Sequence, residues 1–195
     1  MLGFVHRWQN GDMPETLSNP LLSGPFARVL IELRWGDMDA YGHVNNVTQL
    51  RLLEEARVRA FGSPTADRDA SAPASIPGAG EPVQGTAFPA VLGEAAGTTD
   101  LLVFSHRIEY RRPISFRTGP VAVDTVISGL TPATMEVGYT IGEPDGSEIY
   151  TLAETTIAFV DSATGRARRL TDAEAAAIDP FVTDPVPLRP VRNRR

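Results

Sequence analysis

The alternation of apolar and polar residues predicts one strand, one long helix and then a series of further strands. The run Ala27–Trp35 (ARVLIELRW) alternates as a strand with one buried face does. A helix is predicted from about Asn46 to Phe61, and Asn45 before it can cap its first turn. The apolar residues spaced for one face of this helix are Val47, Leu50, Leu53, Val58 and Phe61.

The second half of the chain predicts four antiparallel strands and a short final helix. The strands are expected around Leu102–Tyr110, Val121–Ile127, Met135–Ile141 and Glu148–Val160, with an EPDG turn between the last two. Thr171–Glu174 has the spacing of a capping box, which predicts the short helix. This order of elements predicts an α+β fold in which an antiparallel β-sheet wraps around a central α-helix.

The predicted domain occupies residues 27–178. Residues 1–26 look like an irregular N-terminal lead-in, and residues 179–195 look like a flexible C-terminal tail. Residues 63–98 are rich in Ala, Pro and Gly and have no periodicity, which favours a tolerated surface insertion over a lid. A short turn of helix is expected near Val91–Ala96.

Two charged residues of the predicted helix fall inside its apolar stripe. Glu54 and Arg57 are three residues apart, so their side chains can pair on one face. A buried carboxylate needs such a partner, because burial without one is costly. We therefore expect a buried Glu54–Arg57 pair, which favours a helix enclosed by the sheet with a subunit partner nearby.

Composition narrows the class of protein without identifying it. A chain of 195 residues with a net charge of −6 forms one domain and does not have the basic character of a nucleic-acid binder. No cysteine is present, which excludes disulfides and cysteine chemistry. The N-terminus lacks a signal-peptide pattern, and no stretch is long and apolar enough to span a membrane, so we expect a cytoplasmic protein. With three scattered His and no Cys, no metal and no cofactor are expected.

Residues able to do acyl-transfer chemistry gather between the first strand and the helix. Asp37 and Asp39 precede His43, Asn45 and Asn46 at the helix start. A helix N-terminus offers unpaired N–H donors for developing negative charge, and a carboxylate can attack or activate water. The spacing alone favours the simpler interpretation, ordinary turn residues and a helix cap.

The motifs themselves resemble those of a known family. The segment RWGDMDAYGHVNNVTQLRLLEEAR is similar to the signature of the 4-hydroxybenzoyl-CoA-thioesterase-like branch of the hotdog-fold superfamily, and especially to bacterial long-chain acyl-CoA thioesterases. HRIEYRRPI and AFVDSATGRARRL also fit, so the resemblance covers roughly 27–62 and 100–172. It implies a single hotdog fold and hydrolysis of an acyl-CoA thioester.

The resemblance also implies roles for individual residues. Asp39 matches the catalytic aspartate, acting as nucleophile on the thioester carbonyl or as general base toward water. The backbone N–H of Asn46 matches the donor that polarises this carbonyl. His43 lies in the same loop and is equally a catalytic candidate and a structural residue. Another hotdog branch uses a Glu on the central helix, so Glu54 is the alternative catalytic carboxylate. Substrate-binding candidates are Asn45, Tyr41, Arg111 and Arg112.

Several alternatives stay open at this point. Arg111 and Arg112 have two interpretations that the sequence supports equally. They contact the phosphates of coenzyme A, or they only keep a strand edge soluble. His106 shares a strand face with Phe104 and Ile108, which predicts a hydrogen-bonded core histidine.

The expected partners are the acyl-CoA substrate and further copies of the chain, as a homodimer or a dimer of dimers joined through edge strands. The rival functions are an acyl-carrier-protein thioesterase and a non-catalytic acyl-CoA-binding hotdog protein.

Overall fold

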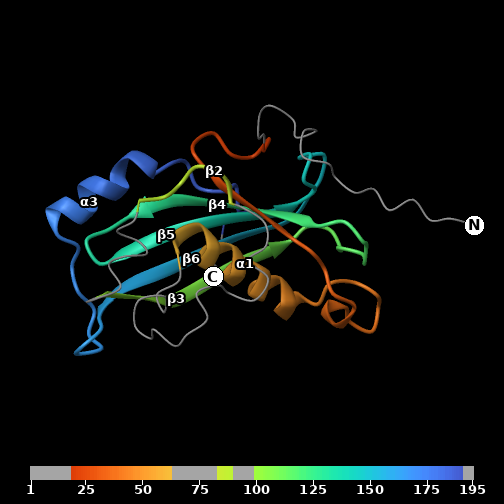
Figure 1. Cartoon of the computed structure of the whole chain (residues 1–195), viewed down its shortest axis with the longest axis horizontal. Coiled ribbons are helices and arrows are strands. Elements are labelled where there is room, and N and C mark those ends of the chain that lie inside the picture. Colours follow the sequence, from red (N-terminus) through yellow and green to blue (C-terminus); the bar gives the residue numbers. More distant parts are fainter. Residues whose placement is uncertain (1–18, 63–82, 90–98, 191–195) are drawn as a thin grey trace, which may run out of the picture.

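The computed structural model describes residues 19–62, 83–89 and 99–190, and its centre is one antiparallel sheet with a long helix against one face (Figure 1). The strand order is β2-β1-β4-β5-β6-β3. The strands are β1 (Ala27–Ile31), β2 (Gln84–Gly85), β3 (Thr99–Tyr110), β4 (Val121–Leu130), β5 (Thr134–Gly142) and β6 (Ile149–Asp161). The helices are η1 (Trp35–Asp37), α1 (Asn46–Phe61), α3 (Asp172–Ile178) and η3 (Asp179–Phe181). The predicted α+β fold, a sheet around a central helix, is confirmed.

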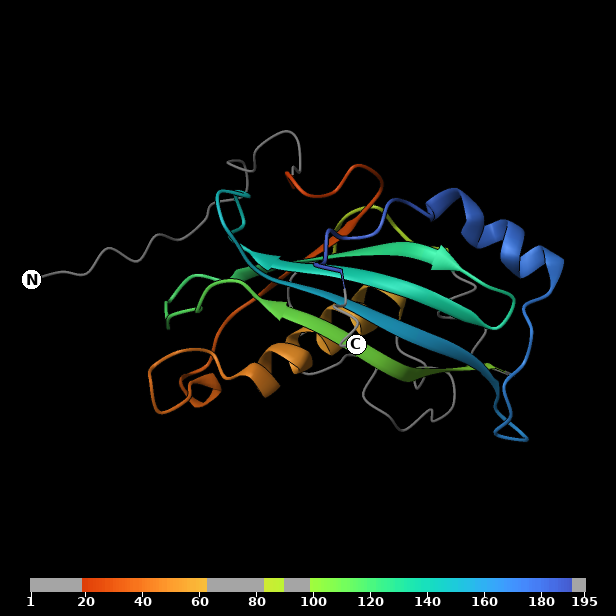
Figure 2. The ribbon, with the colours of Figure 1, turned by 180° about the vertical axis from the view of Figure 1, so that it is seen from behind.

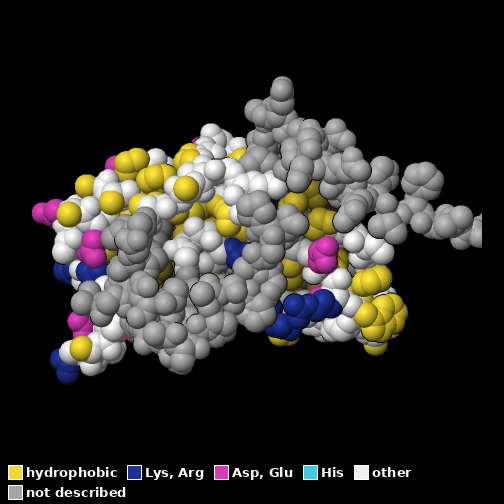
Figure 3. Space-filling model, viewed as in Figure 1, with side chains coloured by type: hydrophobic (Ala, Val, Ile, Leu, Met, Phe, Trp, Pro, Cys, Tyr) yellow, Lys and Arg dark blue, Asp and Glu magenta, His cyan; other side chains and the backbone are white. Residues whose placement is uncertain are grey.

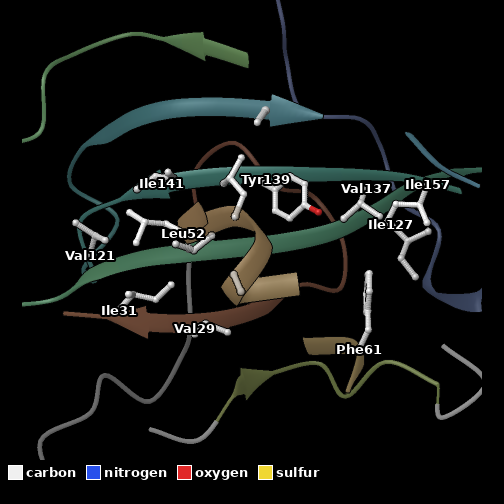
Figure 4. Packing of buried hydrophobic residues seen from close by; sticks show 14 of the residues in the cluster. Val29, Ile31, Leu52, Phe61, Val121, Ile127, Val137, Tyr139, Ile141 and Ile157 are labelled. Carbon is white, nitrogen blue, oxygen red and sulfur yellow. The ribbon is translucent and has the colours of Figure 1, made fainter. Parts of the chain in front are cut away.

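The core lies between α1 and the concave face of the sheet (Figure 4). Leu52, Leu53 and Phe61 of α1 are buried there, and Tyr139 of β5 is fully enclosed. Burying one such side chain completely stabilises the fold by about 1.5–3 kcal/mol. This layer therefore fixes which way α1 faces, and with it the place where the helix begins.

The bounds of α1 are as predicted, but the predicted buried face is partly wrong. Val47 is 62% exposed, whereas Leu52 and Ala56 are buried. The sheet meets α1 along a stripe that is rotated from the one the apolar pattern suggests and that includes the polar Gln49. Glu54 consequently lies outside the core, with its side chain 67% exposed.

The expected buried Glu54–Arg57 pair is therefore also wrong. The Arg57 side chain is only 12% exposed, but its Nη2 lies 4.0 Å from Glu54 Oε1, at the limit of an ion pair. Arg57 Nη1 instead donates to the hydroxyl of Tyr139 at 3.4 Å. The guanidinium is bound to the sheet while the carboxylate faces outward.

The convex face of the sheet carries a buried polar network. The Arg28 guanidinium donates to both carboxylate oxygens of Asp124, at 2.6 and 2.7 Å. Asn19 Nδ2 donates to Asp124 at 2.6 Å and to Thr140 Oγ1 at 2.8 Å. The end of the predicted lead-in is irregular, as expected, but this network attaches it to the sheet.

The C-terminal segment, predicted to be a flexible tail, packs on the same convex face up to residue 190 (Figure 2). Thr183 N–H donates to the carbonyl of Ile127 in β4 at 2.9 Å. Val186 is buried and occupies the space that a side chain at Gly138 would fill. The tail prediction was wrong here because a single apolar residue in a Pro-rich segment is a weak sequence signal.

Part of the predicted insertion belongs to the fold. β2 pairs with β1, and Phe88 stacks edge-on against Phe61 of α1 with ring centroids 5.1 Å apart. The helical turn expected at Val91–Ala96 lies outside the described residues.

The two strands nearest the site differ from their predictions. β1 ends at Ile31, not Trp35, and the chain then turns into η1. His106 is hydrogen-bonded as predicted, to Thr155 at 2.9 Å, but it is exposed and not in the core. Its strand, β3, is the last in the sheet, so its inner face is not fully covered.

Within the described residues, no helix is long and apolar enough to cross a membrane.

Candidate active site

The two aspartates of the loop between β1 and α1 have different environments. Asp37 is buried, and its Oδ2 accepts from the backbone N–H of Arg34 at 2.7 Å. Its carbonyl accepts from the N–H of Asn45 at 2.8 Å. Asp37 therefore joins the two ends of the loop, which is a structural role.

Asp39 is held by its own loop but keeps part of its carboxylate open. Its Oδ1 accepts from the N–H groups of Tyr41 at 2.8 Å and His43 at 3.1 Å. No described residue hydrogen bonds to Oδ2. The backbone hydrogen bond from His43 lowers the pKa of Asp39 below its usual value, and the bond from Tyr41 also lowers it, against an opposing effect of burial. An anion with one oxygen available suits a nucleophile or a general base.

The start of α1 supplies the neighbouring donor. Asn45 is the N-cap, as predicted, and its side chain accepts from Val47 N–H at 2.8 Å. The N–H of Asn46, the first helical residue, has no acceptor among the described residues. First-turn N–H groups carry the positive end of the helix dipole, so this N–H can receive a carbonyl oxygen.

Asp39 and Asn46 line one open hollow at the surface. The other lining residues are Val44, Gln49, Tyr110, Arg111, Arg112 and Pro113. Figure 1 shows the reason: the start of α1 and the end of β3 lie side by side, at the opposite end of the sheet from α3. The structure thus brings together four predicted site residues, namely Asp39, Asn46, Arg111 and Arg112.

Two lining residues were missed by the sequence reasoning. Tyr110 donates its hydroxyl to the carbonyl of Asn46 at 3.2 Å, and burial raises its pKa. Gln49 is buried and accepts from the hydroxyl of Thr151 at 2.6 Å. For Gln49 the sequence does contain an indication of a site role, since it is a polar residue between apolar ones in the helix. For Tyr110 it contains none, because the distance between Tyr110 and the helix depends on how β3 pairs with β6.

The remaining predicted residues lie around this hollow. His43 contributes its backbone, and pairs with Ser115 in an isolated bridge. The Tyr41 side chain is 85% exposed. Trp35 and Phe116 are also exposed, and their rings meet edge-on with centroids 5.5 Å apart. Figure 3 shows hydrophobic side chains at the surface on this side of the molecule.

The two arginines have different partners. Arg112 Nε lies 2.8 Å from Glu148 Oε1, in an ion pair. Arg111 donates to the carbonyl of Pro187 at 3.0 Å, and no carboxylate among the described residues lies within ion-pair distance of it. Arg111 is therefore the less neutralised of the two.

The alternative carboxylate lies elsewhere. Glu54 is two turns further along α1 and does not line the hollow. As for metals, no group of three or more His, Cys, Asp or Glu within the described residues is arranged to hold one.

A family model described as the thioesterase-like superfamily matches residues 33–186. The chain belongs to this superfamily. The match includes the Asp39 loop, α1 and strands β3 to β6, and it bears out the predicted enzyme class of thioester hydrolases. No protein with a curated description matches the sequence.

Solved structures of thioesterases share the fold of this superfamily member. The probable thioesterase YbaW from Escherichia coli is 19% identical, with a TM-score of 0.60, covering 80% of this chain and 98% of its own. A thioesterase from Thermus thermophilus, complexed with coenzyme A and Zn, is 21% identical, with a TM-score of 0.56 and coverages of 80% and 92%. The DHNA-CoA thioesterase from Staphylococcus aureus is 18% identical, with a TM-score of 0.53 and coverages of 74% and 80%. These likenesses confirm the predicted single hotdog fold.

Proposed function

We propose that this protein hydrolyses acyl-CoA thioesters, with Asp39 as the catalytic carboxylate. One observation carries the proposal: the Asp39 carboxylate, which is ionised and receives no bond at Oδ2 from the described residues, lines the same hollow as the first residue of α1. Thioester hydrolysis needs a carboxylate or base on one side of the carbonyl carbon and a donor for its oxygen.

In the proposed reaction the thioester carbonyl oxygen accepts from the N–H of Asn46. This bond strengthens as negative charge develops on the oxygen, so it stabilises the tetrahedral intermediate more than the substrate. Asp39 Oδ2 then attacks the carbonyl carbon directly, or it removes a proton from an attacking water. In the first route the thiolate of coenzyme A leaves and the acyl group stays on Asp39 as a mixed anhydride, which a water then hydrolyses to the free acid. In the second route the oxygen of the attacking water stays on the acyl carbon as the thiolate leaves, so the acyl group departs as a free acid. The proton released by the water neutralises the thiolate or is lost to solvent.

The local contacts favour this assignment over the rivals. Asp39 is anchored through Oδ1, so its reactive oxygen is held in place, and Tyr110 holds the carbonyl of the donor residue Asn46. Glu54 has no comparable donor beside it in the described contacts. Arg111, with no neighbouring carboxylate among the described residues, is the better candidate for a phosphate of the carrier.

The test is thiol release from a panel of acyl-CoAs with the wild type, Asp39→Asn and Glu54→Gln. Asparagine retains an oxygen that can accept from Tyr41 and His43 N–H, so the loop should fold while the negative charge is lost. We expect Asp39→Asn to lower kcat by about 100- to 1,000-fold. Glu54→Gln should retain activity within a few-fold.

Other outcomes separate the alternatives. Full turnover by Asp39→Asn, or its loss in Glu54→Gln, would transfer the catalytic role to the helix carboxylate. Faster release from acyl-carrier protein than from coenzyme A would indicate a carrier-protein thioesterase. Calorimetric binding of acyl-CoA without any thiol release would indicate a binding module.

We also propose that the protein forms a dimer through β3. This strand is at the sheet edge, and Leu102, Val103 and Phe104 on it are 52%, 42% and 78% exposed. A long apolar edge strand is otherwise an aggregation hazard, and pairing with a second copy would satisfy it. Light scattering should show a dimer or a dimer of dimers, and Phe104→Glu should shift it toward a monomer; an active wild-type monomer would contradict the assembly.

A further inference from the structure

The side of β3 that faces α1 forms a continuous stripe that starts at the candidate site. Tyr110, Ile108 and His106 follow each other at every second position, paired with Thr151, Ala153 and Thr155 of β6. Tyr110 lines the hollow with Asp39, and its hydroxyl is 3.2 Å from the Asn46 carbonyl. We call Tyr110, Ile108 and His106 the inner stripe of β3.

The far end of the inner stripe lies well away from the reacting atoms. Tyr110 and His106 are four positions apart, which at about 3.3 Å per strand residue is a distance of roughly 13 Å. A carbonyl bound at Asn46 would have its acyl chain pass the apolar Ile108 before reaching His106.

Polar side chains from four elements meet at this far end. His106 Nδ1 is 2.9 Å from Thr155 Oγ1, and Thr155 also hydrogen bonds to Tyr139. Arg57 Nη1 donates to the hydroxyl of Tyr139 at 3.4 Å, and Glu54 lies beside Arg57. We call Glu54, Arg57, His106, Tyr139 and Thr155 the distal polar cluster.

The distal polar cluster retains unused hydrogen-bonding capacity. Partial desolvation of its otherwise exposed ring lowers the pKa of His106, as does the charge of Arg57, while Glu54 raises it. Its Nε2 forms no hydrogen bond with any described residue. Arg57 is mostly buried against a neutral phenol, and its one carboxylate neighbour among the described residues is 4.0 Å away and largely in solvent. The charge of Arg57 is thus only weakly offset.

We propose that the acyl group lies along the inner stripe of β3 and that the distal polar cluster binds an oxygen function near its far end. The favoured substrates are then acyl-CoAs of about ten carbon atoms that end in a hydroxyl or carboxylate, because C–C bonds of about 1.5 Å in a zigzag chain advance roughly 1.25 Å per carbon. Plain fatty acyl groups of the same length leave the cluster unpaired and desolvated, which disfavours them. This inference rests on the proposed function.

The experiment compares decanoyl-CoA with ω-hydroxydecanoyl-CoA and ω-carboxynonanoyl-CoA by thiol release. In the wild type we expect kcat/KM for at least one oxygenated substrate to exceed that for decanoyl-CoA by about 10-fold, the effect of one added hydrogen bond. His106→Leu should abolish or reverse that preference, and His106→Gln should retain part of it. A carboxylate preference would assign the contact to Arg57, and a hydroxyl preference would assign it to His106.

Ser105→Ala is the matched control. Ser105 also joins β3 to β6, through Thr156 at 3.1 Å, but from the opposite face of the strand. It should therefore leave the substrate preference unchanged. Equal or better hydrolysis of decanoyl-CoA by the wild type, or an equal effect of His106→Leu on all three substrates, would overturn the inference while leaving the thioesterase proposal intact. No hydrolysis of any acyl-CoA would instead refute the proposed function.

Discussion

Two polar networks of this molecule contrast in how completely their carboxylates are bonded. On the convex face, both oxygens of Asp124 accept from Arg28, and one also accepts from Asn19. In the loop before α1, Asp39 has two donors on Oδ1 and none from the described residues on Oδ2. The first carboxylate is almost fully buried, whereas the second lines an open hollow.

The difference shows what each network can do. A buried carboxylate is tolerated only when its lone pairs are occupied, and it then has nothing to offer a substrate. A carboxylate with one hydrogen-bonded oxygen at an open surface costs the fold little free energy, because its other oxygen is not buried. The bonded oxygen holds the carboxylate in place, and the other oxygen is available to a substrate. The closed network should therefore affect unfolding, and the open one should affect turnover.

The largest expected effect is on stability, from Asp124→Ala. Removing this partner takes from the buried Arg28 charge the carboxylate that accepts two of its hydrogen bonds, which costs about 3–5 kcal/mol. Urea unfolding measures the loss. Asp145→Ala, in an exposed turn, is the control and should change stability by less than about 1 kcal/mol. A similar small effect of Asp124→Ala would remove the basis for the contrast.

A second prediction sharpens the contrast within the loop itself. Asp37→Ala removes a buried acceptor from Arg34 N–H and should cost about 1–3 kcal/mol of unfolding free energy. Asp39→Asn, which keeps its oxygen acceptor, should cost much less stability but far more activity. Thermal unfolding and turnover should be measured on the same preparations of both variants. If each variant lost stability and activity to the same extent, the proposed difference between the two aspartates would be contradicted.

The smallest expected effect concerns Glu174, a carboxylate with both oxygens hydrogen-bonded although its side chain is only partly buried. Glu174 is bonded by Arg168 and by Thr171, and these bonds, the one from Arg168 most of all, lower its pKa from 4.5 to about 2. Its side chain is 18% exposed, so we expect Glu174→Gln to cost only about 1 kcal/mol at pH 7.

The sign of its pH dependence follows from the lowered pKa. The stabilisation by Glu174 is fully present above about pH 4.5 and is lost as the pH falls toward 2. The stability difference between wild type and Glu174→Gln should therefore be constant from pH 7 to 5 and shrink steadily as the pH falls from about 4.5 toward 2. A difference that grew on acidification would contradict the assignment.

The sequence predicted those features correctly, residue by residue, that depend on contacts between neighbouring residues. The bounds of α1, the Asn45 cap and the Thr171–Glu174 capping box match, because each depends on atoms a few residues apart. Asp39 could be selected from the motif, although only the structure separates it from the buried Asp37. The burial of Glu54 and the core position of His106 were wrong, since both depend on where the sheet ends.

By itself, the sequence determined the order of elements, the family and the hydrogen-bonding residues of the loop before α1, because apolar periodicity and short-range hydrogen bonds depend on residues close together in the chain. Only the tertiary structure decided that Tyr110 meets the start of α1 and that Arg57 reaches Tyr139. It also turned Glu54 outward and seated Val186 on the sheet. These contacts join residues far apart in the chain, and strand register and packing, not local pattern, bring them together.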